Sequence, residues 1–404
     1  MKRSMIANVV AASLVAFSGS SYAAGLTDDE VRIGVLTDLS AIYSDIEGPG
    51  AVAAAKMAVK DFGGKVLGKK ITILTADTQS KADLSGSKAR ELFEKDKADM
   101  LIGNVSTAAA LAAMEVADQK GKISIVTGAA SLPITNEKCT ATNIHYVYDT
   151  YALSRGTGKA VVDTGKKDWF FVTADYAFGH TLERDTTEVI LANGGKVMGG
   201  VKHPISSQDF SSFMAQAQSS GAQVIALANA GGDTIGSVKQ AAELGIMGSK
   251  QTVVPLLMFL TDVQALGLKQ TSGMSFTTGW YWDYNESNRK FAQRFMKEFK
   301  GKAPTSVQAG VYSATMQYLK AIEATKTDDA TAVMKHLRSI EIDDGLFKGK
   351  IRADGKFEHD MYLLQVKSPK ESKNKNDVAK VIKVIAAKDA TLPLSESKCK
   401  LVQK

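Results

Sequence analysis

The chain has 404 residues, 44% of them hydrophobic and 23% charged, and a formal net charge of +7 at pH 7, a composition ordinary for a soluble globular protein. Its lysines are scattered among carboxylates instead of forming a basic patch, which argues against nucleic acid as a partner. After the N-terminal segment no stretch approaches about 18 uninterrupted apolar residues, so the sequence predicts no membrane span. Because one hydrophobic core stops growing at roughly 250 to 300 residues, the length predicts two lobes.

Residues 1–23 have the pattern of a signal peptide that is removed on export. Two basic residues precede an apolar run, Met5 to Phe17, which is too short to cross a membrane because a span needs about 20 helical residues. Small residues then surround Tyr22, in the pattern that a signal peptidase accepts. The sequence therefore predicts an exported protein that is cleaved near Ala23.

The next part of the chain alternates short β-branched runs with amphipathic stretches. Pro49 suits the first turn of a helix, and the glycine pair at Gly63 ends that helix. Strands that alternate with helices of about 10 to 15 residues indicate a parallel sheet covered on both faces. The predicted elements are strand Val31 to Thr37, helix Pro49 to Phe62, strand Lys70 to Ala76, helix Asp83 to Lys97, strand Asp99 to Gly103, helix Ser106 to Gln119 and strand Lys122 to Thr127.

The same alternation begins again after His145 to Asp149. The predicted elements are helix Tyr151 to Thr164, strand Asp168 to Thr173, helix Phe178 to Ala192, strand Lys196 to Val201, helix Asp209 to Ser219, strand Gln223 to Asn229, helix Asp233 to Leu244 and strand Thr252 to Phe259. Two similar α/β units without a linker of low complexity predict two lobes that face each other across a cleft.

The remaining residues complete these lobes instead of forming a third domain. A turn at Asp354-Gly355 predicts a hairpin. The predicted elements are strand Met274 to Trp282, helices Asn285 to Lys300, Ser306 to Lys326 and Asp329 to Ile340, and hairpin strands Leu346 to Ile351 and Phe357 to Val366. We expect residues 24–148 with 277–356 to form the first lobe and residues 149–276 with 357–404 the second, so that several crossings make a hinge.

The chain has two cysteines, Cys139 and Cys399. Export would place both in an oxidising compartment, which favours a disulfide. Two unpaired thiols remain the alternative, because spacing alone does not establish pairing.

Motifs for catalysis and metal binding are absent. The chain has no G-x-S-x-G, and the segment Gly128 to Ser131 fails that spacing. None of its five histidines stands in H-x-x-x-H or H-E-x-x-H spacing, so we expect no metal. Gly156 to Lys159 lacks the remaining residues of a phosphate-binding loop, and no G-x-G-x-x-G follows the first strand. The sequence therefore argues against an enzyme and predicts no cofactor.

Ligands of doubly wound sheets bind beyond the carboxyl ends of the strands, so the loops there are the candidate site. In the first lobe Ser106 and Thr107 open an Ala-rich helix, whose free N–H groups and positive dipole end favour a carboxylate. Ser106 is equally well explained as an N-cap. One strand later, Gly128, Ala129, Ala130 and Ser131 are small enough for the backbone to approach a ligand.

In the second lobe the corresponding loops carry aromatic and polar residues. Tyr176 and Phe178 follow one strand, and Asn229, Ala230 and Asp233 follow the next. The aromatic side chains would close over an apolar ligand. For Phe178 the alternative is a place in the helix core.

These motifs, in this order, resemble the substrate-binding proteins of branched-chain amino acid ABC transporters. The resemblance rests on Ser106-Thr107, Gly128-Ala129-Ala130, Tyr176-Ala177-Phe178-Gly179, Asp209-Phe210-Ser211 and Lys239-Gln240-Ala241-Ala242 through Gly245, and it covers nearly all of the mature chain. It implies the type I periplasmic binding fold, with two Rossmann-like lobes and a three-strand hinge. It also implies that positions matching Ser106, Gly128 and Ala130 hold a ligand carboxylate and that Phe178 closes over it.

The departures from that family concern the ammonium group. Relatives that bind leucine hold the ammonium with a Glu where this chain has Leu257-Met258-Phe259, and with a Tyr that is matched by about Ala230. An unpaired ammonium in a closed cleft is costly, which argues against a simple amino acid unless Asp233 or Asn229 takes over. Asp233 is also explained as an N-cap. Trp280 to Trp282 suggest an aromatic or apolar carboxylate, or else a packed hinge strand.

The resemblance therefore implies a monomeric periplasmic protein that delivers a small carboxylate-bearing solute to an ABC permease in the inner membrane. Because the same fold serves as the ligand domain of receptors, a free-standing sensor subunit is the alternative. The candidate ligand-binding residues are Tyr43, Ser106, Thr107, Gly128, Ala129, Ala130, Ser131, Tyr176, Phe178, Asn229, Ala230, Asp233, Met258 and Trp280.

Overall fold

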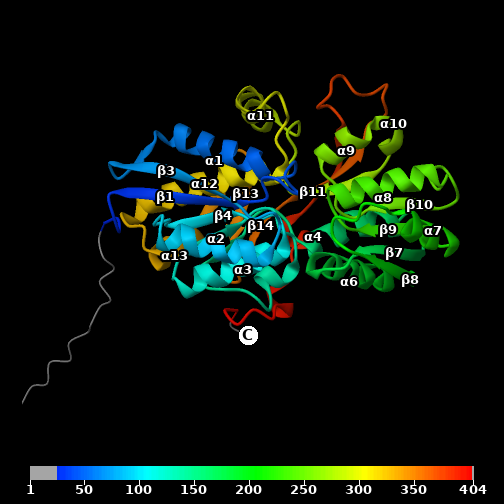
Figure 1. The fold of residues 1–404 in the computed structure, drawn as a ribbon, viewed down its shortest axis with the longest axis horizontal. Coiled ribbons are helices and arrows are strands. Elements are labelled where there is room, and N and C mark those ends of the chain that lie inside the picture. Colours follow the sequence, from blue (N-terminus) through cyan, green and yellow to red (C-terminus); the bar gives the residue numbers. More distant parts are fainter. Residues whose placement is uncertain (1–24, 403–404) are drawn as a thin grey trace, which may run out of the picture.

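The computed structural model describes residues 25–402, which form two α/β lobes side by side (Figure 1). The segment expected to be a signal peptide lies outside these residues. Lobe 1 is built on a six-stranded sheet and lobe 2 on a four-stranded sheet. Within the described residues no helix is long and apolar enough to cross a membrane.

The sheet of lobe 1 is parallel apart from one short edge strand. Its order is β2-β3-β1-β4-β5-β6, and β2 alone runs antiparallel to its neighbour. The strands are β1 (Glu30–Thr37), β2 (Lys65–Val66), β3 (Lys69–Asp77), β4 (Met100–Gly103), β5 (Ile123–Val126) and β6 (Asn143–His145), and the helices between them are α1 (Gly48–Phe62), α2 (Ala82–Glu94) and α3 (Thr107–Gln119). The central strands β4 and β5 are buried along their whole length, as apolar runs in parallel sheets are. The two edge strands β2 and β6 were not predicted because they are only two and three residues long.

The sheet of lobe 2 is fully parallel, in the order β10-β9-β7-β8. Its strands are β7 (Asp168–Ala174), β8 (Lys196–His203), β9 (Val224–Ala228) and β10 (Thr252–Pro255), and its helices include α6 (Ala177–Ala192), α7 (Ser211–Ser219), α8 (Gly232–Glu243), α9 (Leu260–Leu266) and α10 (Leu268–Thr271). The strand predicted to reach Phe259 ends at Pro255, a residue that has no N–H to donate to a ladder. Residues 256–259 instead form a loop that leads to the cleft.

The helix predicted over 151–164 is present over residues 150–162, but its middle turn is a π-helix. It consists of α4 (Thr150–Leu153), a π-helical turn (Ser154–Gly158) and α5 (Lys159–Val162). Gly156 in this turn packs against β11 (Ser275–Thr278), where a Cβ on the glycine would lie 2.1 Å from Thr277 Oγ1. The close approach of the neighbouring strand, which no local pattern reveals, accompanies the change of helix geometry.

The last third of the chain is shared between the lobes. Three helices pack on lobe 1, namely α11 (Glu286–Glu298), α12 (Ser306–Thr325) and α13 (Ala330–Ser339), together with a small sheet of β12 (Glu341–Asp343), β13 (Lys348–Ile351) and β14 (Phe357–His359). A second antiparallel sheet joins β11 to β15 (Met361–Val366) and β16 (Ala379–Ile385). The strand predicted over 357–366 is therefore two strands, in different sheets, and the strand predicted over 274–282 is limited to β11.

The chain crosses between the lobes near residues 146–149, near residue 279 and near residue 360, and its tail crosses back once more after β16. His145 N–H donates to Gly355 O at 2.9 Å, and the His359 ring contacts Val147 O at 2.8 Å through Nε2. Lys356 Nζ lies 3.0 Å from Asp149 Oδ2, and both side chains are buried. These contacts join the first crossing, near residues 146–149, to the third, near residue 360.

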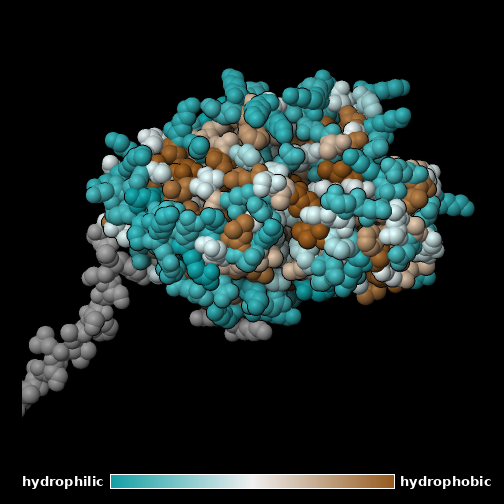
Figure 2. Space-filling model, in the orientation of Figure 1, coloured by the Kyte–Doolittle hydropathy of each residue, from teal (hydrophilic) through white to brown (hydrophobic). Residues whose placement is uncertain are grey.

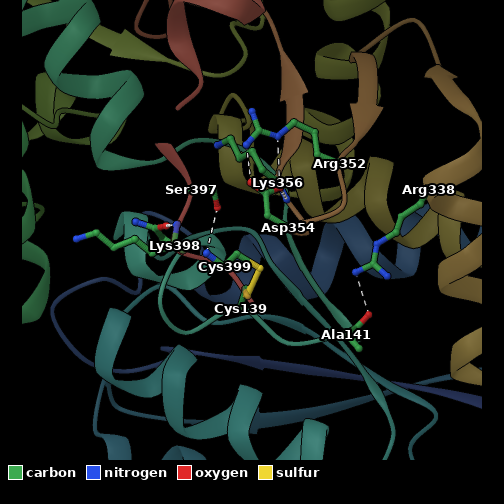
Figure 3. Close-up of a disulfide and its surroundings, with 10 residues drawn as sticks. Cys139, Ala141, Arg338, Arg352, Asp354, Lys356, Ser397, Lys398 and Cys399 are labelled. Carbon is green, nitrogen blue, oxygen red and sulfur yellow. Dashed lines mark hydrogen bonds and ion pairs between the residues drawn. A yellow bond between two sulfur atoms is a disulfide. The ribbon is translucent and has the colours of Figure 1, made fainter. Parts of the chain in front are cut away.

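The C-terminal tail returns to lobe 1, although the sequence assigned it to lobe 2. After β16 and α14 (Ala387–Ala390), Cys399 forms a disulfide with Cys139, which confirms the predicted pairing (Figure 3). Arg352 Nη1 donates to Leu392 O at 2.8 Å, and Lys398 N–H donates to Asn136. The disulfide therefore anchors the tail to a loop of lobe 1.

Candidate functional site

A narrow pocket lies between the lobes. Tyr43, Ile46, Val105, Gly128 and Ala130 line it from lobe 1, Tyr148 from the first crossing segment, and Tyr176, Phe178, Ala230, Leu257 and Phe259 from lobe 2. Figure 2 shows apolar side chains at the boundary between the lobes on a mostly hydrophilic face. Its volume is only about 10 Å³, which is room for about one water molecule. Pockets for drug-sized ligands span roughly 300 to 1,000 Å³, so the lobes stand too close together in this structure to admit a solute as large as an amino acid.

The two lobes touch directly at this pocket. The hydroxyl groups of Tyr43, in the loop after β1, and Tyr176, at the start of α6, are hydrogen-bonded to each other across the cleft. Gly231, just before α8, has φ +57° and lies under Tyr43, where a Cβ would be 3.0 Å from Cδ1 of that ring. A side chain on Gly231 would therefore crowd the Tyr43 ring at this contact between the lobes.

The wall on lobe 1 is formed by two adjacent loops with free backbone donors. Ala129 N–H donates to Asn104 O at 2.8 Å, which places the loop after β5 beside the loop after β4. Within residues 25–402, the N–H groups of Ser106, Gly128 and Ala130 have no acceptor. Buried backbone donors are normally paired, and a helix N-terminus favours negative charge. This wall therefore offers a carboxylate several donors at the start of α3.

Ser106 occupies the N-cap position of α3, but its hydroxyl makes no capping bond. Its backbone is extended, with φ −91° and ψ 133°, and its side chain is buried. No other side chain in the described part of the chain bonds to this hydroxyl. Ser106 therefore stands at the N-cap position without a capping bond from its side chain, and its hydroxyl is free to donate.

Three neighbouring candidates, Thr107, Ala129 and Ser131, already make hydrogen bonds within the protein. The hydroxyls of Thr107 and Ser131 bond to each other at 3.0 Å. Burial lowers the pKa of His145 to about 3, so its ring is neutral and its Nε2 lies 2.7 Å from Ala129 O. None of the side chains of Thr107, Ala129 and Ser131 lines the pocket. Ser106 lies beside Val105, which does.

The wall on lobe 2 is mainly aromatic and aliphatic. The rings of Tyr176 and Phe178 are 6.0 Å apart, and Phe259 meets Tyr148 edge-on at 6.2 Å. The Tyr148 hydroxyl donates to Gly128 O at 2.6 Å, which fixes the ring over the lobe 1 loop. Phe178 is buried at the start of α6 and also lines the pocket, so it belongs to both the helix core and the cleft.

The polar residues expected on lobe 2 lie behind the pocket wall. Asn229 is buried and bonded to His203, Ser237 and Thr234. Asp233 accepts from Ser206 N–H at 3.2 Å through Oδ2, while its buried Oδ1 has no partner among residues 25–402. Neither side chain lines the pocket.

Asp233 is not the N-cap of α8, because that position is Gly231, so the N-cap explanation is wrong. Burial raises the pKa of Asp233 to about 7. The two remaining candidates are packed elsewhere: Met258 lies in the core of lobe 2, and Trp280 stacks edge-on against Phe291 at 5.8 Å.

Sequence reasoning missed several residues of the site. Ile46, Val105 and Tyr148 line the pocket next to residues that were singled out, and Leu257 and Phe259 belong to the segment noted only for lacking an acid. Val105 could have been predicted from the sequence, because it directly precedes Ser106 in a predicted ligand-binding loop. No local signal marks Tyr148, because the crossing segment reaches the pocket only through the arrangement of the lobes.

A cleft between two α/β lobes, with free donors on one wall and aromatic rings on the other, defines a two-lobed protein that binds small molecules. The family model of the periplasmic binding proteins matches residues 30–375, and the chain belongs to that family. This is a family of ABC transporter solute-binding proteins and not of enzymes.

Individual relatives agree with this assignment. A periplasmic binding protein from Burkholderia mallei is 49% identical, with a TM-score of 0.91 over 93% of this chain and 100% of that one. A branched-chain amino acid ABC transporter periplasmic ligand-binding protein from Burkholderia xenovorans LB400 is 37% identical, with a TM-score of 0.83 over 92% and 100% of the two chains. The Leu/Ile/Val-binding protein homolog 6 of Brucella melitensis is 29% identical over 315 residues, which are 76% of this chain and 79% of the relative.

More distant solved structures share the fold alone. A solute-binding protein from R. palustris in complex with benzoate is 20% identical, with a TM-score of 0.79 over 88% of this chain and 96% of that one. The type I periplasmic binding fold expected from the sequence is thereby confirmed at high and low identity.

Proposed function

We propose that the protein captures a small carboxylate in the pocket between its lobes and delivers it to an ABC permease in the inner membrane. The carboxylate is an aromatic or branched aliphatic acid, or a hydrophobic amino acid. The mature protein acts in the periplasm as a monomer after cleavage near Ala23. The observation that supports this proposal is the contrast between the two walls of the pocket. The lobe 1 wall suits the anionic head of a ligand, its carboxylate, and the lobe 2 wall suits the apolar body, the rest of the molecule.

The lobe 1 wall supports the anionic head. Free N–H groups at Ser106, Gly128 and Ala130 lie where the dipole of α3 is positive, and each hydrogen bond to a charged group contributes roughly 1.5 to 3 kcal/mol. Among residues 25–402, no carboxylate side chain lines the pocket. A ligand carboxylate is therefore not opposed by a neighbouring acid in direct contact.

The lobe 2 wall supports an apolar body. Phe178, Leu257 and Phe259 present only carbon atoms of their side chains to the pocket. Burial of apolar surface there stabilises a complex by roughly 25 cal/mol per Å². An ammonium group would meet no counter-charge on this wall unless Asp233 turned towards it.

The ligand class can be tested with pairs of molecules that differ only by an ammonium group. We expect 4-methylpentanoate to bind more tightly than leucine by at least about tenfold, or 1.4 kcal/mol, because the ammonium of leucine lacks a partner. Isothermal titration calorimetry of both ligands, with phenylalanine and benzoate as the aromatic set, measures this difference. Tight binding of leucine that Asp233→Asn abolishes would contradict the expectation and establish an amino-acid site.

Ser106 provides a direct test of the anion wall. We expect Ser106→Ala to weaken carboxylate binding by about 1 to 3 kcal/mol, because one donor to a charged group is lost. Thr107→Val is the matched control, since the Thr107 hydroxyl bonds to Ser131 and its removal should leave the affinity unchanged. Calorimetry gives the affinities and thermal unfolding the stabilities. A lower melting temperature of Ser106→Ala with unchanged affinity would assign this hydroxyl a structural role only.

A thermal-shift screen tests the proposed function as a whole. Ligands that bind only the folded state raise the apparent stability, by about 2.7 kcal/mol at a hundredfold excess over Kd. We expect aromatic or branched aliphatic acids to give the largest shifts among amino acids, aromatic acids, aliphatic acids and sugars. Shifts confined to sugars would contradict the carboxylate proposal.

A further inference from the structure

A buried acid, Glu47, lies directly behind the anion wall. It immediately precedes α1, and its side chain points between the loops after β1, β4 and β5. Thr37 Oγ1 donates to its Oε2 at 2.6 Å and Thr127 Oγ1 to its Oε1 at 2.7 Å. A Cβ placed on Gly128 would lie only 2.7 Å from Oε1. Gly128 thus has the pocket on one side and a carboxyl group on the other.

No cation balances this carboxyl group. Among residues 25–402, no Lys, Arg or His side chain forms an ion pair with Glu47. The ionisable groups that face it are Asp38, directly after β1, and Tyr148, on the first crossing segment. The Gln308 amide of α12 donates to the backbone oxygen of Glu47 and not to its carboxyl group. Burial is the main reason why the pKa of Glu47 is raised to about 7, and the charge of Asp38 adds to it.

We propose that Glu47 couples ligand capture to protonation, so that the protein takes up one proton on Glu47 as it binds a carboxylate at the Gly128 wall. This proposal rests on the proposed function, because it places the ligand carboxylate at the free donors beside Gly128. Two like charges on either side of one glycine in a buried site repel each other strongly. Protonation removes that repulsion, and Thr37 or Thr127 then accepts the new O–H.

The direction of the pH effect follows from the pKa of about 7. Below pH 7 Glu47 is already neutral in the free protein, so affinity does not depend on its titration. Above pH 7 the free protein must take up a proton to bind, so affinity falls as the pH rises. If Glu47 stays protonated in the complex, binding at pH 8 is weaker than at pH 6 by up to about tenfold.

The test uses the mature protein and three carboxylate probes, benzoate, 4-methylpentanoate and leucine, titrated at pH 6, 7 and 8. For a probe that binds, we expect the affinity to fall roughly fivefold to tenfold from pH 6 to pH 8. Glu47→Gln, which keeps the shape and lets one Thr hydroxyl accept, should bind with nearly constant affinity over this range. Asp233→Asn is the matched control with benzoate and 4-methylpentanoate, which carry no ammonium group. The pKa of Asp233 is also about 7, but its side chain lies in lobe 2, so this variant should retain the pH dependence.

A second measurement needs no variant. Calorimetry at pH 7.5 in Hepes and in Tris, whose ionisation enthalpies differ, counts the protons taken up, and we expect roughly 0.5 to 0.8 per ligand. A probe that binds without proton uptake, or a Glu47→Gln protein that keeps the pH dependence, would overturn this inference and leave the proposed function intact. Binding of none of the three probes at any pH would overturn the ligand class and this inference together.

Discussion

Replacing Lys356 with methionine is expected to lower the free energy of unfolding by about 3 to 5 kcal/mol, because it leaves the buried Asp149 carboxylate without its partner. The two side chains form a 3.0 Å ion pair with about 5% and 1% of their surfaces exposed. Burial alone would raise the pKa of Asp149, but the charge and hydrogen bond of Lys356 and the hydrogen bond from Ala152 N–H together outweigh it, and that pKa is lowered. Urea denaturation at pH 7 measures the loss.

The pair joins the first and third crossing segments, so its loss should also change the geometry of the pocket between the lobes. The double variant Lys356→Met/Asp149→Asn is the control, because it removes both charges while the Asn side chain can still accept from Ala152 N–H, the cap of α4. We expect the double variant to recover at least half of the lost stability. A single variant as stable as the unchanged protein at pH 7 would show that the pair contributes nothing.

Removing the disulfide with Cys139→Ser/Cys399→Ser is expected to cost about 2 to 5 kcal/mol of stability. The sequence separation of 260 residues makes the loop long, and closing a long loop removes much entropy from the unfolded chain. Both cysteines are buried, and the bond holds the tail against lobe 1 (Figure 3). Chemical denaturation of the two forms measures the difference.

Free-thiol titration of the denatured, unreduced protein is the accompanying check. It should find essentially no thiol, since both cysteines in the chain are bonded to each other. Two reactive thiols per chain would contradict the bond. If the stability falls but hydrogen exchange shows that residues 387–402 stay attached to lobe 1, the disulfide stabilises the protein only by restricting the unfolded chain.

The sequence by itself determined the two-lobed α/β architecture. Helix bounds such as Gly48–Phe62 and Glu286–Glu298 agree with prediction to within about two residues, because apolar periodicity, Pro49 and Gly63 act locally. The loops around Ser106 and Gly128 are also predicted from local patterns. The ends of the strands are visible in the sequence, and ligand-binding loops directly follow the ends of parallel strands.

Only the tertiary structure decided how those loops meet and what lies behind them. The pocket role of Tyr148, the contact of Tyr43 with Tyr176 and the burial of Glu47 all depend on segments far apart in the chain. The same holds for the break of residues 357–366 into β14 and β15, since the chain changes lobes between them. Local patterns record which face of an element is apolar, whereas the partner of that face and the charge left beside a ligand are set by long-range packing.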